Sequence, residues 1–109
     1  MTACLIYSTW PDAGSAQACA AQLIDAQVAA CVTVLPAAHS TFRWGGKVQQ
    51  TQEAVMLVKT DKTRAGAARD ALLAAHPHDL PCVLAFDVND EGSNLNFLQW
   101  IATETTPPG

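Results

Sequence analysis

The chain alternates between short β-rich runs and longer stretches with helical spacing. Residues 2–9 are rich in β-branched and aromatic side chains, which predicts a strand. Asp12 follows at the position of a helix N-cap, and residues 13–29 place apolar side chains at helical spacing. This stripe consists of Ala16, Cys19 and Leu23. The pattern predicts an amphipathic helix that packs on a sheet.

The middle of the chain has the pattern of one long antiparallel hairpin. Two extended runs, 31–35 and 41–44, precede a Gly-Gly pair that is typical of a hairpin turn, and residues 53–60 form the returning strand. An arm of this length would expose Phe42 and Trp44 unless another chain covered them. The pattern is therefore a first indication of oligomerisation.

The remaining residues repeat the order of strand and helix. Either Thr60 or Asp61 is expected to cap a second helix, which ends at the His-Pro pair 76–77 because proline cannot continue the hydrogen-bond ladder. Its apolar stripe consists of Ala65, Ala68, Leu72 and Ala75. Residues 82–88 are predicted to form a fourth strand, and residues 94–103 a short final helix.

This order of elements predicts an α+β fold. With right-handed crossovers it gives the ferredoxin-like split βαβ sandwich, an antiparallel four-stranded sheet with both main helices on one face and a short C-terminal helix. The length of 109 residues predicts a single domain over residues 1–109. Because this fold serves many functions, it does not decide the activity.

Charge and composition narrow the class of partner. A formal net charge of -4 argues against nucleic acid, whose binding depends on clustered lysine and arginine. No run approaches the roughly 20 apolar residues of a membrane span, and the N-terminal residues lack a basic leader. We therefore expect a cytoplasmic protein with no nucleic-acid or membrane partner. The spacing of its four cysteines matches neither a disulfide framework nor a zinc motif.

No motif in the sequence is typical of catalysis. There is no serine in a nucleophile elbow, no Walker-type glycine loop and no Gly-x-Gly-x-x-Gly, and no local signature supports a Cys-His nucleophile pair. The sequence therefore predicts neither an enzyme nor an organic cofactor.

Metal ligation is the chemistry that the residue types favour more. The conceivable ligands are one thiol, two imidazoles and one carboxylate: Cys31, His76, His78 and Asp79. Thiolate and imidazole together suit copper or zinc. A histidine at the end of a helix also interacts with free carbonyl groups, so the spacing alone leaves a structural role open.

Three further residues have both a structural and a functional interpretation. Trp44 is either a packing anchor between subunits or the wall of a ligand pocket. Glu53 and Lys59 are either solvated surface charges or polar groups of such a pocket.

Five segments occur in an order and at spacings that are specific when taken together. They are Ala30-Cys31-Val32, Ser40-x-Phe42-x-Trp44-x-Gly46-x-Val48, Lys59-Thr60, His76-Pro77 with Pro81, and Phe97-Leu98-x-Trp100-Ile101. Over almost the whole chain they resemble the CutA family, the divalent-cation tolerance proteins.

The resemblance implies a ferredoxin-like fold assembled into a homotrimer, similar in architecture to the PII-type signalling proteins. It also implies tolerance of copper and other divalent ions without a defining enzymatic reaction. The clefts between subunits would be lined by the family-typical polar residues that match Glu53, Lys59 and His76, near Trp44.

The chain departs from the family pattern at three positions that concern metal binding. His78 replaces the usual aromatic residue, and Cys82 replaces the usual acid. Ser8 occupies the end of the first strand, where some relatives carry a cysteine. A copper site that uses that thiol does not transfer, whereas His78 and Cys82 add possible ligands.

Two hypotheses follow. The first is a trimeric metal-response protein that binds copper or another divalent ion, with Cys31 and His76 as the most transferable ligands and His78 as a local addition. The alternative is a PII-like signalling or small-molecule binding module, in which the intersubunit clefts hold a small anionic metabolite. In that module Lys59 would supply the charge and Trp44 the wall.

Overall fold

The computed structural model describes residues 2–107; Met1 and residues 108–109, which the predicted domain includes, lie outside the described residues. The elements in chain order are β1 (Ala3–Trp10), α1 (Ala13–Asp25), β2 (Cys31–Trp44), β3 (Lys47–Asp61), α2 (Lys62–Ala75), β4 (Val83–Asp87) and α3 (Leu95–Glu104).

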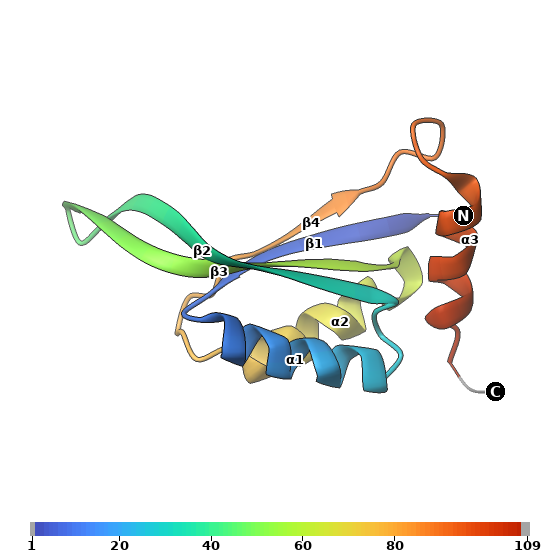
Figure 1. Ribbon diagram of the computed structural model, residues 1–109, viewed down its shortest axis with the longest axis horizontal. Coiled ribbons are helices and arrows are strands. Elements are labelled where there is room, and N and C mark those ends of the chain that lie inside the picture. Colours follow the sequence, from blue (N-terminus) through green and yellow to red (C-terminus); the bar gives the residue numbers. More distant parts are fainter. Residues whose placement is uncertain (1, 108–109) are drawn as a thin grey trace.

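The four strands form one antiparallel sheet in the order β2-β3-β1-β4, which confirms the predicted ferredoxin-like split βαβ fold. Helices α1 and α2 lie side by side under one face of the sheet, and α3 lies at the end away from the hairpin (Figure 1). The β2-β3 hairpin extends past both helices as a free arm. The molecule is therefore elongated, with extents of 47 × 29 × 21 Å.

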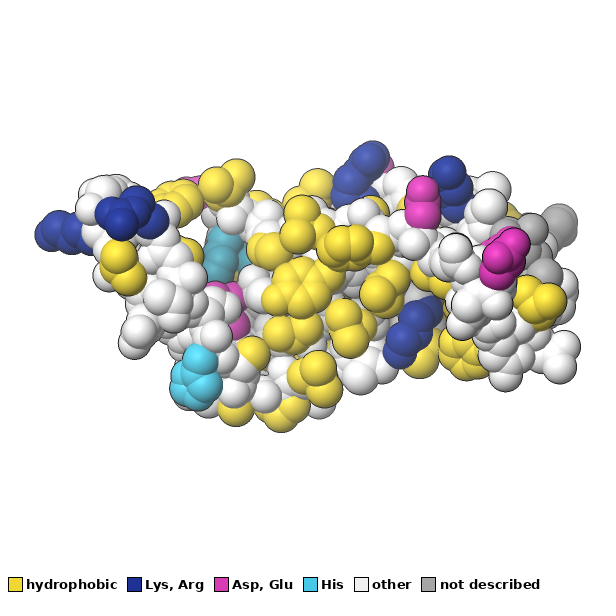
Figure 2. All heavy atoms as spheres, turned by 90° about the horizontal axis from the view of Figure 1, so that it is seen from above, with side chains coloured by type: hydrophobic (Ala, Val, Ile, Leu, Met, Phe, Trp, Pro, Cys, Tyr) yellow, Lys and Arg dark blue, Asp and Glu magenta, His cyan; other side chains and the backbone are white. Residues whose placement is uncertain are grey.

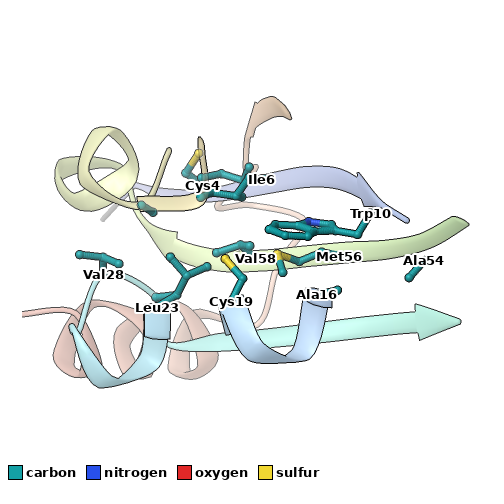
Figure 3. Close-up of a cluster of buried hydrophobic side chains, with 13 residues drawn as sticks. Cys4, Ile6, Trp10, Ala16, Cys19, Leu23, Val28, Ala54, Met56 and Val58 are labelled. Atoms are coloured by element: carbon teal, nitrogen blue, oxygen red, sulfur yellow. The ribbon is translucent and has the colours of Figure 1, made fainter. Parts of the chain in front are cut away.

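The core lies between the sheet and the two long helices because alternate strand residues point toward them. On β1 these residues include Ile6 and Trp10, and on β3 they include Met56 and Val58, all of them buried. Leu23 of α1 packs into the same cluster (Figure 3). The predicted stripe of α1 is thus confirmed as the buried side of that helix.

Helix α1 is shorter than its sequence predicts. It ends at Asp25 rather than Ala29, because Gln27 adopts a left-handed backbone conformation with φ 57°. The Val28 amide then donates to the Leu23 carbonyl, as in a Schellman-type helix end. A glutamine in this conformation is uncommon, and no glycine marked the position in the sequence.

Strand β2 is continuous where two separate runs were predicted. The register shifts between Leu35 and Ala38, and Ala37 has a φ of 61°. This is a β-bulge, which accommodates Pro36 without ending the strand. Strand β3 begins at Lys47, directly after the predicted Gly-Gly turn, so the paired arm is longer than expected.

The ends of α2 and α3 lie close to the positions that the sequence predicts. Asp61 is the N-cap of α2, and its carboxylate accepts a hydrogen bond from the Thr63 amide at 3.0 Å. Asn94 caps α3 in the same way. Ala75, predicted on the buried stripe of α2, is exposed instead, because it faces an open groove between α1 and α2.

The face of the sheet opposite α1 and α2 carries apolar side chains without a helical cover over most of its area. We call this the open face; its large apolar residues include Leu5, Tyr7, Leu57, Leu84 and Phe86. Figure 2, which views the molecule from this side, shows hydrophobic side chains gathered in a patch at its centre. Leu84 and Phe86 remain 53% and 50% exposed.

Candidate ligand and metal site

A hollow of about 630 Å³ lies on the open face at the base of the hairpin arm. We call it the arm hollow. Its aromatic walls are Tyr7, Phe42 and Trp44. Groups that can bind a cation line it as well: they are Glu53, His78 and Cys82. Figure 2 shows imidazole and acidic atoms recessed between the arm and the apolar patch. Its volume is in the range of small-molecule sites.

The pleat of the hairpin explains why these side chains share one surface. Residues two apart on a strand point to the same side, so Ser40, Phe42 and Trp44 of β2 lie on one face. The partners on β3 in that register are Thr51 for Ser40 and Gln49 for Phe42. The bulge in β2 keeps this set on the open face although the strand contains Pro36.

The arm hollow has an acidic character. Within residues 2–107 the carboxylate of Glu53 has neither a hydrogen bond nor an ion pair, and no lysine or arginine lines the hollow. Its charge therefore favours a positively charged ligand over an anion.

His76 lies at the C-terminal end of α2, buried and fully engaged by hydrogen bonds. Its Nε2 lies 2.7 Å from the carbonyl oxygen of Thr9, and its Nδ1 accepts a hydrogen bond from the His78 amide at 3.1 Å. The ring also packs against Trp10, with centroids 4.4 Å apart. These partners require a neutral ring protonated on Nε2, so neither nitrogen has a lone pair available for a metal ion.

His78 is held in place by His76, yet its own ring nitrogens have no hydrogen-bond partner within residues 2–107. The two imidazole rings lie 4.9 Å apart. Because His76 occupies a buried pocket and His78 is exposed, the two histidines separate into a structural and an accessible one. The sequence had left this distinction open.

Cys31 and Lys59 lie at the other end of the sheet. The Lys59 ammonium donates to the Thr33 hydroxyl at 2.6 Å and lies 3.6 Å from the Cys31 sulfur. Lys59 also lines a smaller hollow of about 260 Å³ beside α3. The predicted cleft residues are thus divided, with Trp44 and Glu53 in the arm hollow and Lys59 outside it.

The structure does not bring the predicted thiol and imidazole ligands together within one chain. Cys31 lies opposite Lys59, and Lys59 lies opposite Leu5, whereas His76 binds Thr9. Four residues along β1 span roughly 13 Å, which is several times a metal-ligand bond length. Among residues 2–107, no three His, Cys, Asp or Glu side chains are grouped closely enough to hold a metal ion.

The four cysteines differ in their availability as thiolates. Burial raises the pKa of the Cys19 thiol, and burial together with the nearby Asp87 carboxylate raises the pKa of Cys4. Cys31 and Cys82 are only partly buried. A metal ligand must be deprotonated and within reach of the ion, so the buried Cys4 and Cys19 are poor candidates.

Tyr7 is the residue of the arm hollow that sequence reasoning did not single out. The signal was present, because Tyr7 alternates with the buried Ile6 and Ser8 and must therefore face away from the helices. Only the pairing of β1 with its neighbours shows that this opposite face leads into the hollow.

The family of this chain follows from its match to a protein-family model. The model of the CutA1 divalent ion tolerance proteins matches residues 4–104. The chain belongs to the CutA1 family. This confirms the family that the sequence motifs indicated.

Individual CutA relatives agree with this over most of their length. A divalent-cation tolerance protein CutA from Pectobacterium atrosepticum is 38% identical over 99 residues, covering 91% of this chain and 88% of the relative. The crystal structure of CutA from Xylella fastidiosa has a TM-score of 0.90 at 42% identity, covering 95% of this chain and 98% of its own.

A third CutA relative bears on location. The structure from Archaeoglobus fulgidus, described as a periplasmic divalent cation tolerance protein, has a TM-score of 0.88 at 33% identity and covers 95% of this chain and 99% of its own. Within residues 2–107, no helix has both the length and the apolar character that crossing a bilayer requires. A cytoplasmic location stays a prediction for this CutA chain.

Proposed function

We propose that this CutA1-family chain acts in divalent-cation tolerance as a homotrimer that binds copper or another divalent ion, and that its role is binding rather than catalysis. The observation that carries the proposal is the chemistry of the arm hollow. Glu53 and His78 present an unpaired carboxylate and an unpaired imidazole to the hollow, and no basic side chain among the described residues lines it. These are groups that attract and ligate cations.

The open face supports assembly. Leu84 and Phe86 are about half exposed next to the partly buried Tyr7 and Leu57, and contiguous apolar surface of this kind is typical of an interface. The arm adds Trp44, which is 57% exposed. A trimer, which the resemblance to the CutA family implies, would cover both. Light scattering coupled to size-exclusion chromatography should give three times the 11.5 kDa of the chain.

Metal binding is tested by calorimetric titration of Cu(II) and Zn(II) into protein prepared without an affinity tag. We expect His78→Ala and Glu53→Gln to weaken binding. His39→Ala is the matched control, because His39 is exposed on the arm but does not line the hollow. Full-strength binding by both hollow variants would show that the ion binds elsewhere.

The same titration tests the ligands predicted from sequence. Cys31→Ser alone should leave binding intact if the arm hollow is the site, whereas a strong loss would mean that Cys31 of one copy meets the hollow of another. His76→Ala needs a melting curve alongside it, because His76 also supports the local structure.

The alternative of a PII-like module that binds an anionic metabolite has the volume of the arm hollow and the Trp44 wall in its favour. Lys59, its proposed charge, lies outside that hollow. A thermal-shift screen separates the two functions, since a ligand that binds the folded state raises the melting temperature. Stabilisation by nucleotides or carboxylates but not by metal ions would favour the module.

A further inference from the structure

We propose that the soft ligand of this chain is the thiol of Cys82, which binds a cuprous ion in the arm hollow together with the His78 imidazole. This inference rests on the proposed metal-binding role. This assigns the thiol to a residue other than Cys31.

Both ligands lie next to residues that are anchored near the C-terminal end of β1, at Thr9 and Ser8. His78 is held by His76, whose Nε2 donates to the Thr9 carbonyl. Cys82 directly precedes Val83, which pairs with Ser8, so Cys82 enters the sheet beside Thr9. The bend at residues 78–80 returns the chain between these two anchors. His78 and Cys82, four positions apart in the sequence, therefore line the same hollow.

Both groups are also accessible and unengaged. The His78 ring is exposed, and the Cys82 side chain is partly buried; within residues 2–107 neither makes a side-chain hydrogen bond. Cys31 differs in this respect, because the Lys59 ammonium lies 3.6 Å from its sulfur and would repel an incoming cation.

The residue types favour Cu(I). Thiolate is a soft ligand that selects cuprous ion, and imidazole also suits copper. Binding forms a sulfur–copper bond and a nitrogen–copper bond, and the proton of the Cys82 thiol is released to solvent. No change in the oxidation state of the metal or the protein is involved. The unpaired Glu53 carboxylate in the same hollow attracts the incoming cuprous ion.

His76 acts as a positioning residue in this arrangement. It stacks on the buried Trp10 and fixes the His78 backbone through its Nδ1, so it orients the ligand without binding the ion. In the His-Pro-His sequence, the first histidine therefore positions the second, and the second binds the ion.

The experiment is an anaerobic competition of the assembled, untagged protein with a chromophoric Cu(I) chelator. We expect Cys82→Ser and His78→Ala each to lower Cu(I) affinity at least about 10-fold, since even loss of an outer-sphere partner of a metal ligand typically costs about 10- to 100-fold. The near-ultraviolet thiolate-to-copper absorption should disappear in Cys82→Ser. Cys31→Ser is the matched control and should retain both affinity and absorption.

Three outcomes would overturn the assignment. If Cys31→Ser loses Cu(I) and Cys82→Ser retains it, the thiol ligand is Cys31 and the proposed function stands without this site. If both serine variants bind as wild type does, no thiol is involved. If the unmodified protein does not bind Cu(I) or divalent ions, both this inference and the proposed function fail. Melting curves of the variants, with the same midpoint as wild type, show that the fold is retained.

Discussion

The two faces of the sheet are both apolar, but α1 and α2 cover only one of them. On the covered face Ile6 is 1% exposed, whereas Leu84 and Phe86 on the open face are 53% and 50% exposed. Strands that are buried on both sides have continuous apolar runs, and Val55–Val58 is such a run. The difference indicates that a single copy buries only one of the two apolar faces of its sheet.

Polar groups on the covered face sharpen the contrast. The Thr60 hydroxyl donates to the Val28 carbonyl at 2.6 Å, so it is buried with a partner. The Ser8 hydroxyl is equally buried but has no hydrogen-bond partner within residues 2–107. An unpaired buried hydroxyl loses its bonds to water without replacement, so Ser8 is a point where the core loses stability, as is the buried indole nitrogen of Trp10, which is also unpaired among the described residues.

The largest expected effect concerns the covered face. Leu72→Ala should lower the free energy of unfolding by about 2–5 kcal/mol, because Leu72 is fully buried and its truncation leaves a cavity. The adjacent Leu73 is 42% exposed, and Leu73→Ala should stay within about 0.5 kcal/mol of wild type. Guanidinium denaturation at one fixed protein concentration measures both. Equal losses would contradict the difference in packing.

The next effect concerns the open face. If other copies cover it, Phe86→Ser removes about 1.5–3 kcal/mol of apolar burial per chain, and the assembly should dissociate at higher protein concentration. Sedimentation velocity over a dilution series measures this. Ile24→Ser on the outer side of α1 is the control, since Ile24 is 43% exposed but lies away from the open face. An unchanged dissociation profile for Phe86→Ser would place the interface elsewhere.

A smaller effect separates the two buried hydroxyls. Thr60→Val should cost about 1–2 kcal/mol, because it leaves the Val28 carbonyl without its partner. Ser8→Ala should be neutral or stabilising, since it removes a buried hydroxyl that has no partner. Thermal unfolding of the two variants next to wild type gives the comparison. Destabilisation by Ser8→Ala would mean that Ser8 is paired in the assembled protein.

The smallest effect is a dependence of stability on alkaline pH. Burial raises the pKa of the Cys19 thiol above its ordinary value of 9.0, so the folded state favours the protonated form more than the unfolded state does. That contribution is fully present below the unfolded pKa and is lost as pH rises from there through the higher folded pKa. Stability measured from pH 7 to 10 should therefore fall less steeply in Cys19→Ala than in wild type; identical slopes would exclude this contribution.

The fold and the burial of many residues could be predicted from the sequence because they depend on local patterns. Runs of β-branched and apolar residues identified the strands, and helical spacing identified Ala16, Cys19 and Leu23 as the buried stripe of α1. Capping residues placed the start of α2 at Thr60 or Asp61, of which Asp61 is the cap, and the two glycines marked the hairpin turn. The prediction failed where the backbone adopts an unusual conformation without glycine, as at Gln27 and Ala37.

The sequence by itself determined that imidazole, thiol and carboxylate groups were present and that the family was CutA. Only the tertiary structure decided which of them share a surface, because that depends on strand register and on the path of the chain after α2. Register placed Cys31 beside Lys59 and away from His76, whose ring is engaged at Thr9. The same folding brought His78 and Cys82 to one hollow, since His76 contacts Thr9 and Val83 pairs with the neighbouring Ser8.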